Sequence, residues 1–220
     1  MTGIEELPNK QWILAGDTCI SAWSREWGTI KCDPALFDIM TPWLKDAKVV
    51  WDIGACIGDH TRFYLDIGKK VIAVEPNPLA FKCLAHNCPE ATLLNVAASG
   101  KSGTLRFIAD ADNAGASRVF ADGPIEVPAV KMDDLDLPLP DFVKIDAEGW
   151  EYDVLAGMTV TLRLKHPLMF IEINAGALNA NGHSATEIMT LLKYIGYTKF
   201  QIHQHQLGWD AAQFDLIVSI

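Results

Sequence analysis

The chain has 220 residues, of which half are hydrophobic and 21% are charged, and its formal net charge is −10. This length and composition predict one domain with a full hydrophobic core and exclude a disordered chain. The negative charge repels phosphate backbones and anionic lipid surfaces, so it disfavours a nucleic acid or membrane partner and favours a small neutral or cationic one.

Several sequence features bear on the compartment. The first six residues lack the basic and apolar segments of a signal peptide. No run of about 18 apolar residues occurs, so we expect no membrane-spanning helix. The five cysteines are odd in number and include no C-x-x-C pair, which is typical of free thiols in a reducing compartment. We therefore expect a cytoplasmic protein, and the sequence leaves a monomer and a homodimer both open.

Residues 1–47 form a predicted N-terminal extension that holds four of the seven tryptophans. Alternation over residues 13–23 predicts a short hairpin. Asp33 followed by Pro34 is typical of a helix start. Three later apolar residues would then share a helical face: Phe37, Met40 and Leu44. The aromatic residues either cover one side of the domain or form a lid that keeps water from an acceptor pocket.

The main domain, residues 48–220, begins with a buried strand, a glycine loop and a helix. Residues 49–53 are mostly apolar, and residues 52–58 read D-I-G-A-C-I-G. This order brings backbone N–H groups to a nucleotide-like ligand. The dinucleotide fingerprint G-x-G-x-x-G fails at two of three glycines, which counts against a nicotinamide-dependent oxidoreductase. The observed D-x-G-x-x-x-G form is closer to the S-adenosylmethionine loop of class I methyltransferases.

The next two strands are predicted at residues 70–75 and 92–97. Glu75 ends the first of them, 23 residues after Asp52, where a carboxylate can accept hydrogen bonds from both ribose hydroxyls. The loop at Val96 and Ala97 is expected where an adenine ring would approach.

Two alternating runs then interrupt the strand and helix order. Residues 104–108 and 125–130 are predicted to pair as strands, and the polar loop 112–118 lies between them. Loops of this kind carry function more often than stability.

A second polar cluster follows the strand predicted at residues 141–146. Strand ends on this edge of a doubly wound sheet face the ligand crevice, so Asp146 and Glu148 are paired carboxylates at its rim. Lys144 shares a strand face with Asp146 and is expected to hold it by a charge pair. The following strand brings Glu172 to the same edge, and we expect at least one of the three carboxylates to be buried with a shifted pKa.

The rest of the chain closes the sheet. Ser184 has capping-box spacing and begins a helix that Gly196 ends. Three strands complete the prediction: residues 168–173, 197–203 and 214–220. His203 and His205 share a strand face and could chelate a metal, but no third ligand is evident. His183 is a slightly better candidate for the pocket.

Four motifs together resemble the FkbM family of methyltransferases: D-I-G-A-C-I-G at 52–58, V-E-P-N-P at 74–78, M-D-D-L at 132–135 and D-F-V-K-I-D-A-E-G-W-E at 141–151. The resemblance runs from about Val49 to Glu172. It implies a class I α/β, Rossmann-like fold, with a mostly parallel seven-stranded sheet and helices on both faces. The alternating runs add an inserted β-hairpin to this fold, and the N-terminal extension lies outside the resemblance. The resemblance also implies S-adenosylmethionine as cofactor and a hydroxyl of a sugar or secondary metabolite as acceptor.

One departure from the family pattern concerns the glycine loop. The family commonly has Asn where this chain has Cys56, and Asn tolerates left-handed backbone better than Cys. A difference in this turn is therefore expected. The extension before the resemblance is expected to help set the choice of substrate.

Spacing and resemblance together give two sets of candidate residues. The cofactor set is Asp52, Ile53, Gly54, Ala55, Gly58, Glu75, Pro76, Asn77, Val96, Ala97 and Asp146. The catalytic set is Asp146, Glu148 and Glu172, with Asp146 or Glu148 as the base that takes the acceptor proton. No metal is assigned, although Asp146 and Glu172 could instead hold a divalent cation that lowers the acceptor pKa. A catalytically silent protein that keeps the cofactor fold is the alternative function.

Overall fold

A seven-stranded sheet forms the centre of the computed structural model, which describes residues 3–31, 33–110, 112–204 and 213–220. The strand order is β12-β13-β11-β10-β3-β4-β5, and only β13 runs antiparallel to its neighbours. The strands are β3 (Val49–Ile53), β4 (Lys70–Val74), β5 (Thr92–Leu94), β10 (Phe142–Ile145), β11 (Leu168–Asn174), β12 (Lys199–Gln204) and β13 (Gln213–Ser219). The predicted mostly parallel sheet of seven strands is therefore confirmed.

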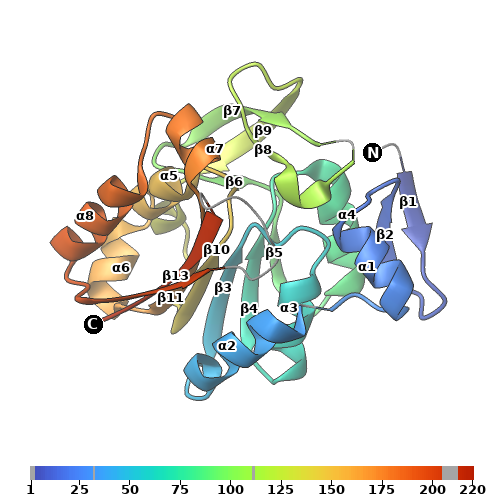
Figure 1. Ribbon diagram of the computed structural model, residues 1–220, viewed down its shortest axis with the longest axis horizontal. Coiled ribbons are helices and arrows are strands. Elements are labelled where there is room, and N and C mark those ends of the chain that lie inside the picture. The colour runs from blue at the N-terminus through green and yellow to red at the C-terminus, as the bar shows by residue number, and fades with distance from the viewer. Residues whose placement is uncertain (1–2, 32, 111, 205–212) are drawn as a thin grey trace.

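Helices cover both faces of this sheet (Figure 1). One face carries α2 (Pro34–Leu44), α3 (Asp59–Asp66) and α4 (Pro78–Asn87), and the other carries α5 (Glu151–Ala156), α6 (Thr159–Lys165) and α8 (Ala185–Ile195). Successive strand residues alternate between the two cores, as Val50 and Trp51 do. The short helix α7 (Ala175–Ala180) follows β11 directly.

The register of the sheet sets the edge where the strands end. Ile145 pairs with both Ile53 and Ile171, and Ile53 also pairs with Val74. The residues that follow these positions must therefore stand side by side along one edge: Gly54, Glu75, Asp146 and Glu172. The sheet itself brings together residues that are up to 118 positions apart in the sequence, from 54 to 172.

The insertion after β5 is a small sheet of its own, above the central sheet in Figure 1. It contains β6 (Ala97–Ala98), β7 (Gly103–Ile108), β8 (Arg118–Val119) and β9 (Ile125–Val130) in the order β6-β9-β7-β8. The predicted antiparallel pair is β7 with β9 and is confirmed, but the insertion has four strands rather than a hairpin.

The predicted strand over residues 92–97 is wrong in its second half. The strand ends at Leu94, and Ala97 pairs with Ala129 of the inserted sheet. The side chain of Asn95 donates to the carbonyl oxygens of Glu75 and Pro76, at 2.7 and 3.3 Å. These bonds fix the point where the chain leaves one sheet for the other.

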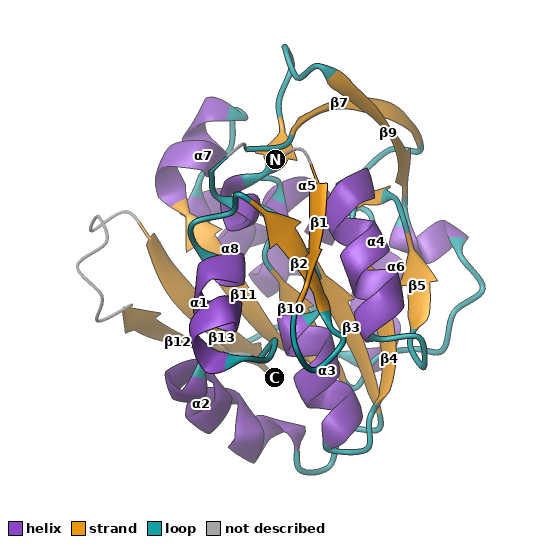
Figure 2. Ribbon diagram, turned by 90° about the vertical axis from the view of Figure 1, so that its right-hand side faces the viewer, coloured by secondary structure: helices purple, strands orange, loops and turns teal. Residues whose placement is uncertain are grey.

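The N-terminal extension packs on the α3 and α4 side of the domain. Its hairpin, β1 (Gly3–Glu6) with β2 (Trp12–Ala15), lies beside α4 in both views (Figures 1 and 2). The hairpin predicted over residues 13–23 is wrong, because helix α1 (Ile20–Trp27) follows β2. The buried carboxylate of Asp17 accepts from the N–H of Ser21 and, at 2.9 Å, from the N–H of Ala114 in the insertion.

Several local predictions are confirmed. Asp33 accepts from the N–H of Ala35 at the start of α2, and Ser184 accepts from the N–H of Glu187 at the start of α8, which Gly196 ends. The side chain of His203 lies 2.9 Å from that of Gln201, and His205 lies outside the described residues. None of the helices in the described ranges combines the length and apolar character that a membrane span requires.

Candidate active site

A cavity with about 740 Å³ of empty space opens where the central strands end. The inserted sheet closes it from the other side, with Phe107, Val119 and Ala98 in its wall. Six of the predicted cofactor residues line it: Ile53, Gly54, Glu75, Pro76, Ala97 and Asp146. The strand edge and the insertion therefore enclose one continuous space.

The other five predicted cofactor residues lie outside this lining and have structural contacts. Asp52 is fully buried and accepts from the hydroxyl of Thr61 at 2.6 Å. The side chain of Asn77 caps α4, Ala55 belongs to one hydrophobic core, and Val96 packs against the other. Gly58 is the N-cap of α3. These residues hold the loops in place rather than face the cavity.

The glycine loop keeps a left-handed backbone at three positions. Gly54 and Gly58 have φ of 82° and 99°, and Cys56 has φ of 48° although it is not glycine or asparagine. A Cβ on Gly54 would lie 1.8 Å from the carbonyl oxygen of Asp146, so glycine is needed there for packing alone. Cys56 thus holds a conformation that its side chain disfavours.

Glu75 is oriented by two backbone groups. Its carboxylate accepts from the N–H of Asn77 at 2.7 Å and from the N–H of Cys56 at 2.8 Å, one at each oxygen. Each oxygen keeps a further lone pair for a ligand hydroxyl. Burial raises the pKa of Glu75 to about 7, against the effect of these two hydrogen bonds. The geometry fits a pair of ribose hydroxyls.

Lys144 holds the ends of two strands together. Its ammonium donates to the carbonyl oxygen of Gly54 at 2.8 Å and lies 3.1 Å from Asp146 and 3.7 Å from Asp52. The side chain is almost wholly buried. Burial lowers the pKa of Lys144, but the nearby carboxylates of Asp146 and Asp52 outweigh it and raise the value. The predicted charge pair between Lys144 and Asp146 is confirmed.

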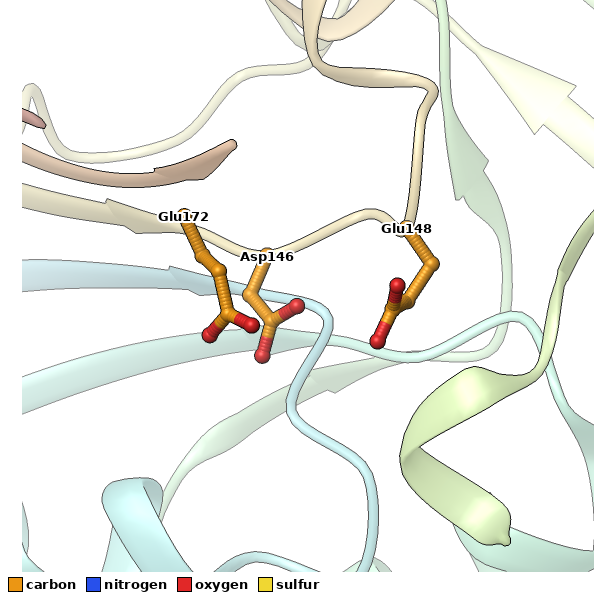
Figure 3. A group of neighbouring side chains, drawn as sticks. All are labelled: Asp146, Glu148 and Glu172. Atoms are coloured by element: carbon orange, nitrogen blue, oxygen red, sulfur yellow. The ribbon is translucent and has the colours of Figure 1, made fainter. Parts of the chain in front are cut away.

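The three predicted catalytic carboxylates come together at the strand edge (Figure 3). One oxygen from each of Asp146, Glu148 and Glu172 lies within 4.8 Å of the others. Burial, with Asp146 as the nearest like charge, raises the pKa of Glu148 to about 9 and that of Glu172 to about 7. The expected shift in pKa is therefore confirmed for Glu148 and Glu172, although all three side chains are half-buried rather than buried.

A tight turn places Glu148 at this edge. Glu148 and Gly149 have φ of 48° and 96°, and a Cβ on Gly149 would lie 2.5 Å from the backbone of Ala177. The buried side chain of Glu151 accepts from the N–H of Gly149 at 2.7 Å. The side-chain amide of Asn181 donates to the carbonyl oxygen of Gly149. The E-G-x-E part of the motif is thus a structural turn that presents Glu148.

A second cavity, with about 910 Å³ of empty space, adjoins the first. The two share six lining residues: Ile20, Asp59, His60, Gly115, Asp146 and Glu148. The second cavity alone reaches Glu172, Gln213 and five residues of the N-terminal extension, three of which are Trp23, Lys31 and Asp33. A ligand in each cavity would meet at Asp146 and Glu148.

Sequence reasoning missed several residues of these walls. His60 and Asp59 follow the glycine loop directly, so their position at the helix start could have marked them. Arg118 and Ser117 lie in the polar loop that the sequence marked as functional, without a stated role. His183, considered for the pocket, lines neither cavity; its ring stacks on Tyr152, and its Nε2 lies 3.4 Å from Asp153.

Comparisons with known proteins agree with the fold. A family model described as "Methyltransferase FkbM domain" matches residues 52–199. The hexuronic acid methyltransferase AglP of Haloferax volcanii is 32% identical over 151 aligned positions, which cover 63% of this chain and 62% of that protein.

Two solved structures share the architecture. An FkbM methyltransferase from Methylobacillus flagellatus superposes with a TM-score of 0.59 and 18% identity, over 91% of this chain and 51% of that one. The N-methyltransferase NodS of Bradyrhizobium japonicum superposes with a TM-score of 0.53 and 12% identity, over 83% of this chain and 90% of that one. These likenesses show a class I methyltransferase fold. The chain spans about 62% of the length of AglP and about half that of the first structure.

The left-handed backbone at Cys56 gives the first prediction. Replacement by asparagine should raise the melting temperature by about 2 °C, because Asn tolerates this conformation better. Thermal unfolding of purified protein measures the change. Cys56→Ala is the matched control and should bring no such gain, since alanine is as disfavoured at positive φ. Equal changes in the two variants would contradict the explanation.

The buried carboxylates predict how stability depends on pH. The pKa of Glu148 is about 9 in the folded protein and ordinary in the unfolded chain, so its contribution is fully present below about pH 4.5 and is lost as the pH rises through 9. Glu148→Gln should therefore gain at least about 4 °C in melting temperature relative to the wild type between pH 5 and pH 9.

The matched control for this measurement is Glu126→Gln, because Glu126 is an exposed glutamate on β9. Its melting temperature should follow that of the wild type over the same range. A constant difference between Glu148→Gln and the wild type at all pH values would show that burial does not shift the pKa of Glu148.

Proposed function

Because the chain belongs to the FkbM methyltransferase family, we propose that it transfers the methyl group of S-adenosylmethionine to a hydroxyl of a sugar or secondary metabolite. The observation that carries the proposal is the meeting of two cavities at Asp146 and Glu148. One cavity is lined by groups suited to a nucleoside cofactor, and the other opens beside it toward the N-terminal extension, where an acceptor would enter.

The first cavity has the donor and acceptor groups that such a cofactor needs. Glu75 offers free lone pairs for ribose hydroxyls, and the small side chains of Ala97 and Ala98 leave room for a flat ring beside Phe107. Trp150 lines the cavity, and its buried indole N–H has no hydrogen-bond partner among the described residues. An orphaned donor of this kind is costly unless a ligand accepts from it.

When bound, S-adenosylmethionine supplies a methyl group that its positive sulfonium already activates. The protein must align the acceptor oxygen with that group, and such alignment can contribute roughly 7–11 kcal/mol. Walls from both cavities would keep water away from the reaction.

We assign to Asp146 the role of the base that takes the proton from the acceptor hydroxyl. A base must be ionised before it acts, and the pKa of about 9 keeps Glu148 protonated at neutral pH in the free protein. Asp146 instead has the Lys144 ammonium at 3.1 Å and lines both cavities. Glu148 and Glu172 would then orient the acceptor by hydrogen bonds.

Residues 1–47 are proposed as the acceptor side of the enzyme, with residues 48–220 as the cofactor-binding domain. Trp23, Lys31 and Asp33 line the second cavity and do not line the first. The Asp17 carboxylate also ties this segment to Ala114 of the insertion, which supports a cover built from both.

The cofactor assignment predicts the result of a calorimetric titration. The wild type should bind S-adenosylmethionine and S-adenosylhomocysteine in the micromolar range, and Glu75→Ala should weaken both by at least about tenfold, because two ribose hydrogen bonds are lost. Glu75→Gln, which keeps the side-chain shape and one oxygen, should fall between the two. Undiminished binding by Glu75→Ala would exclude this role, and no binding by well-folded wild type would exclude the cofactor.

The base assignment predicts the kinetics of two variants. Asp146→Asn should reduce production of S-adenosylhomocysteine on a panel of hydroxylated sugars by about 10²–10⁴-fold while keeping cofactor binding. Glu148→Gln should lose less, and full activity in both variants would place the base elsewhere.

Two controls separate the competing mechanisms. The oxygens of Asp146, Glu148 and Glu172 are close enough to hold a divalent cation, so exhaustive chelation should leave the rate unchanged if the carboxylate acts alone. Cofactor binding without turnover on any acceptor would support the catalytically silent alternative.

A further inference from the structure

The second cavity has an unbalanced charge, which bears on the acceptor if the proposed function holds. Five of its lining residues carry a carboxylate: Asp33, Asp59, Asp146, Glu148 and Glu172. Against them stand one lysine, Lys31, and one histidine, His60, among the described lining residues. Acidic side chains therefore outnumber basic ones around an acceptor in this space, even though Glu148 is protonated at neutral pH in the free protein.

Three of the five carboxylates already have partners of their own. Asp146 has the ammonium of Lys144 at 3.1 Å, and Asp59 has the ring of His60 at 3.2 Å. Asp33 caps helix α2. These residues add to the negative field but are not free to hold a ligand cation.

Lys31 does not supply the missing positive charge. Its ammonium lies 4.4 Å from the ring centroid of Trp27, a residue outside the cavity lining. The lysine is thus directed at an aromatic face, and within the described residues it forms no ion pair with the carboxylates of the cavity.

Glu172 is the carboxylate that remains to pair with a positive group on the acceptor. Within the described part of the chain, its side chain accepts from the amide of Gln213, and no cation lies within 4.0 Å of it. It lines the second cavity and not the first, and its strand neighbour across the ladder is another acid, Asp215. Glu148 also has an amide partner, Asn174 at 3.3 Å, but it lines both cavities and so lies at their junction rather than in the acceptor cavity alone.

Aromatic surface stands on the acceptor side of the same cavity. Trp23 of α1 lines it, is 38% exposed, and stacks on Trp27 with 6.3 Å between the ring centroids. Such a ring offers a flat apolar face to the C–H side of a sugar.

We propose that the acceptor is a hydroxylated amine, such as an amino sugar, whose ammonium pairs with Glu172 and whose ring lies against Trp23. A carboxylate on the acceptor would be repelled by the same residues. The cavity therefore disfavours a uronic acid, although the name of the relative AglP gives a hexuronic acid as its substrate.

Three glucosides that differ only at carbon 6 test this proposal. Calorimetry on the full chain saturated with S-adenosylhomocysteine would compare methyl 6-amino-6-deoxyglucoside, methyl glucoside and methyl glucuronide. The amine should bind at least about tenfold more tightly than the neutral sugar, because it forms a charged hydrogen bond with a half-buried carboxylate. The uronic acid should bind most weakly.

Three variants distinguish a direct ion pair with Glu172 from the effect of the overall negative charge of the protein. Glu172→Gln should reduce the preference for the amine over the neutral sugar to less than about threefold, whatever its effect on overall affinity. Glu126→Gln removes the same charge from the surface and should leave the preference unchanged. Trp23→Ala should weaken amine and neutral sugar alike, so their ratio should stay the same.

The outcomes distinguish the proposal from the function on which it rests. Equal binding of amine and neutral sugar, tightest binding of the uronic acid, or no binding of any glucoside would overturn the proposal. A Glu172-dependent amine preference without any methylated product on incubation with S-adenosylmethionine would support the charge assignment and overturn methyl transfer instead.

Discussion

A buried ammonium holds this site together. Lys144 joins the carbonyl of Gly54 after β3 to the carboxylate of Asp146 after β10, and it also balances the fully buried Asp52. Loss of one partner in a buried ion pair leaves an uncompensated charge and costs about 3–5 kcal/mol. The glycine loop and the acidic edge are thus positioned by one side chain, which is why neither can move without the other.

The close approach of these two strand ends explains why the loop tolerates so little change. Gly54 has no room for a side chain because the backbone of Asp146 lies against it. The N–H of Cys56 is in turn used to orient Glu75 at the end of the next strand. Three strand ends therefore form a single hydrogen-bonded unit, and the inserted sheet provides the opposite wall of the cavity.

Periodicity and motif spacing predicted the central sheet well, because its strands are buried and its turns carry strong local signals. The carboxylate cluster could be predicted equally well, since parallel strands must end at a common edge. The predictions that were wrong concern segments whose structure depends on contacts with residues far away in the sequence. Asp17 binds Ala114, 97 residues away, and the strand after Thr92 is interrupted by bonds from Asn95 back to residues 75 and 76. Nor could spacing separate residues that face the cavity, such as Glu75, from those that support it, such as Asn77.

The family match contains the cofactor residues but leaves out several residues of the second cavity. The family match covers residues 52–199, which contain the glycine loop, Glu75, Asp146 and Glu148. The second cavity depends in addition on Trp23, Asp33 and Gln213, which lie outside that match. Gln213 is the amide partner of Glu172, so a residue beyond the family match sets the surroundings of a carboxylate within it. A relative can therefore share the cofactor residues and the acidic edge and still present a different charge to its acceptor.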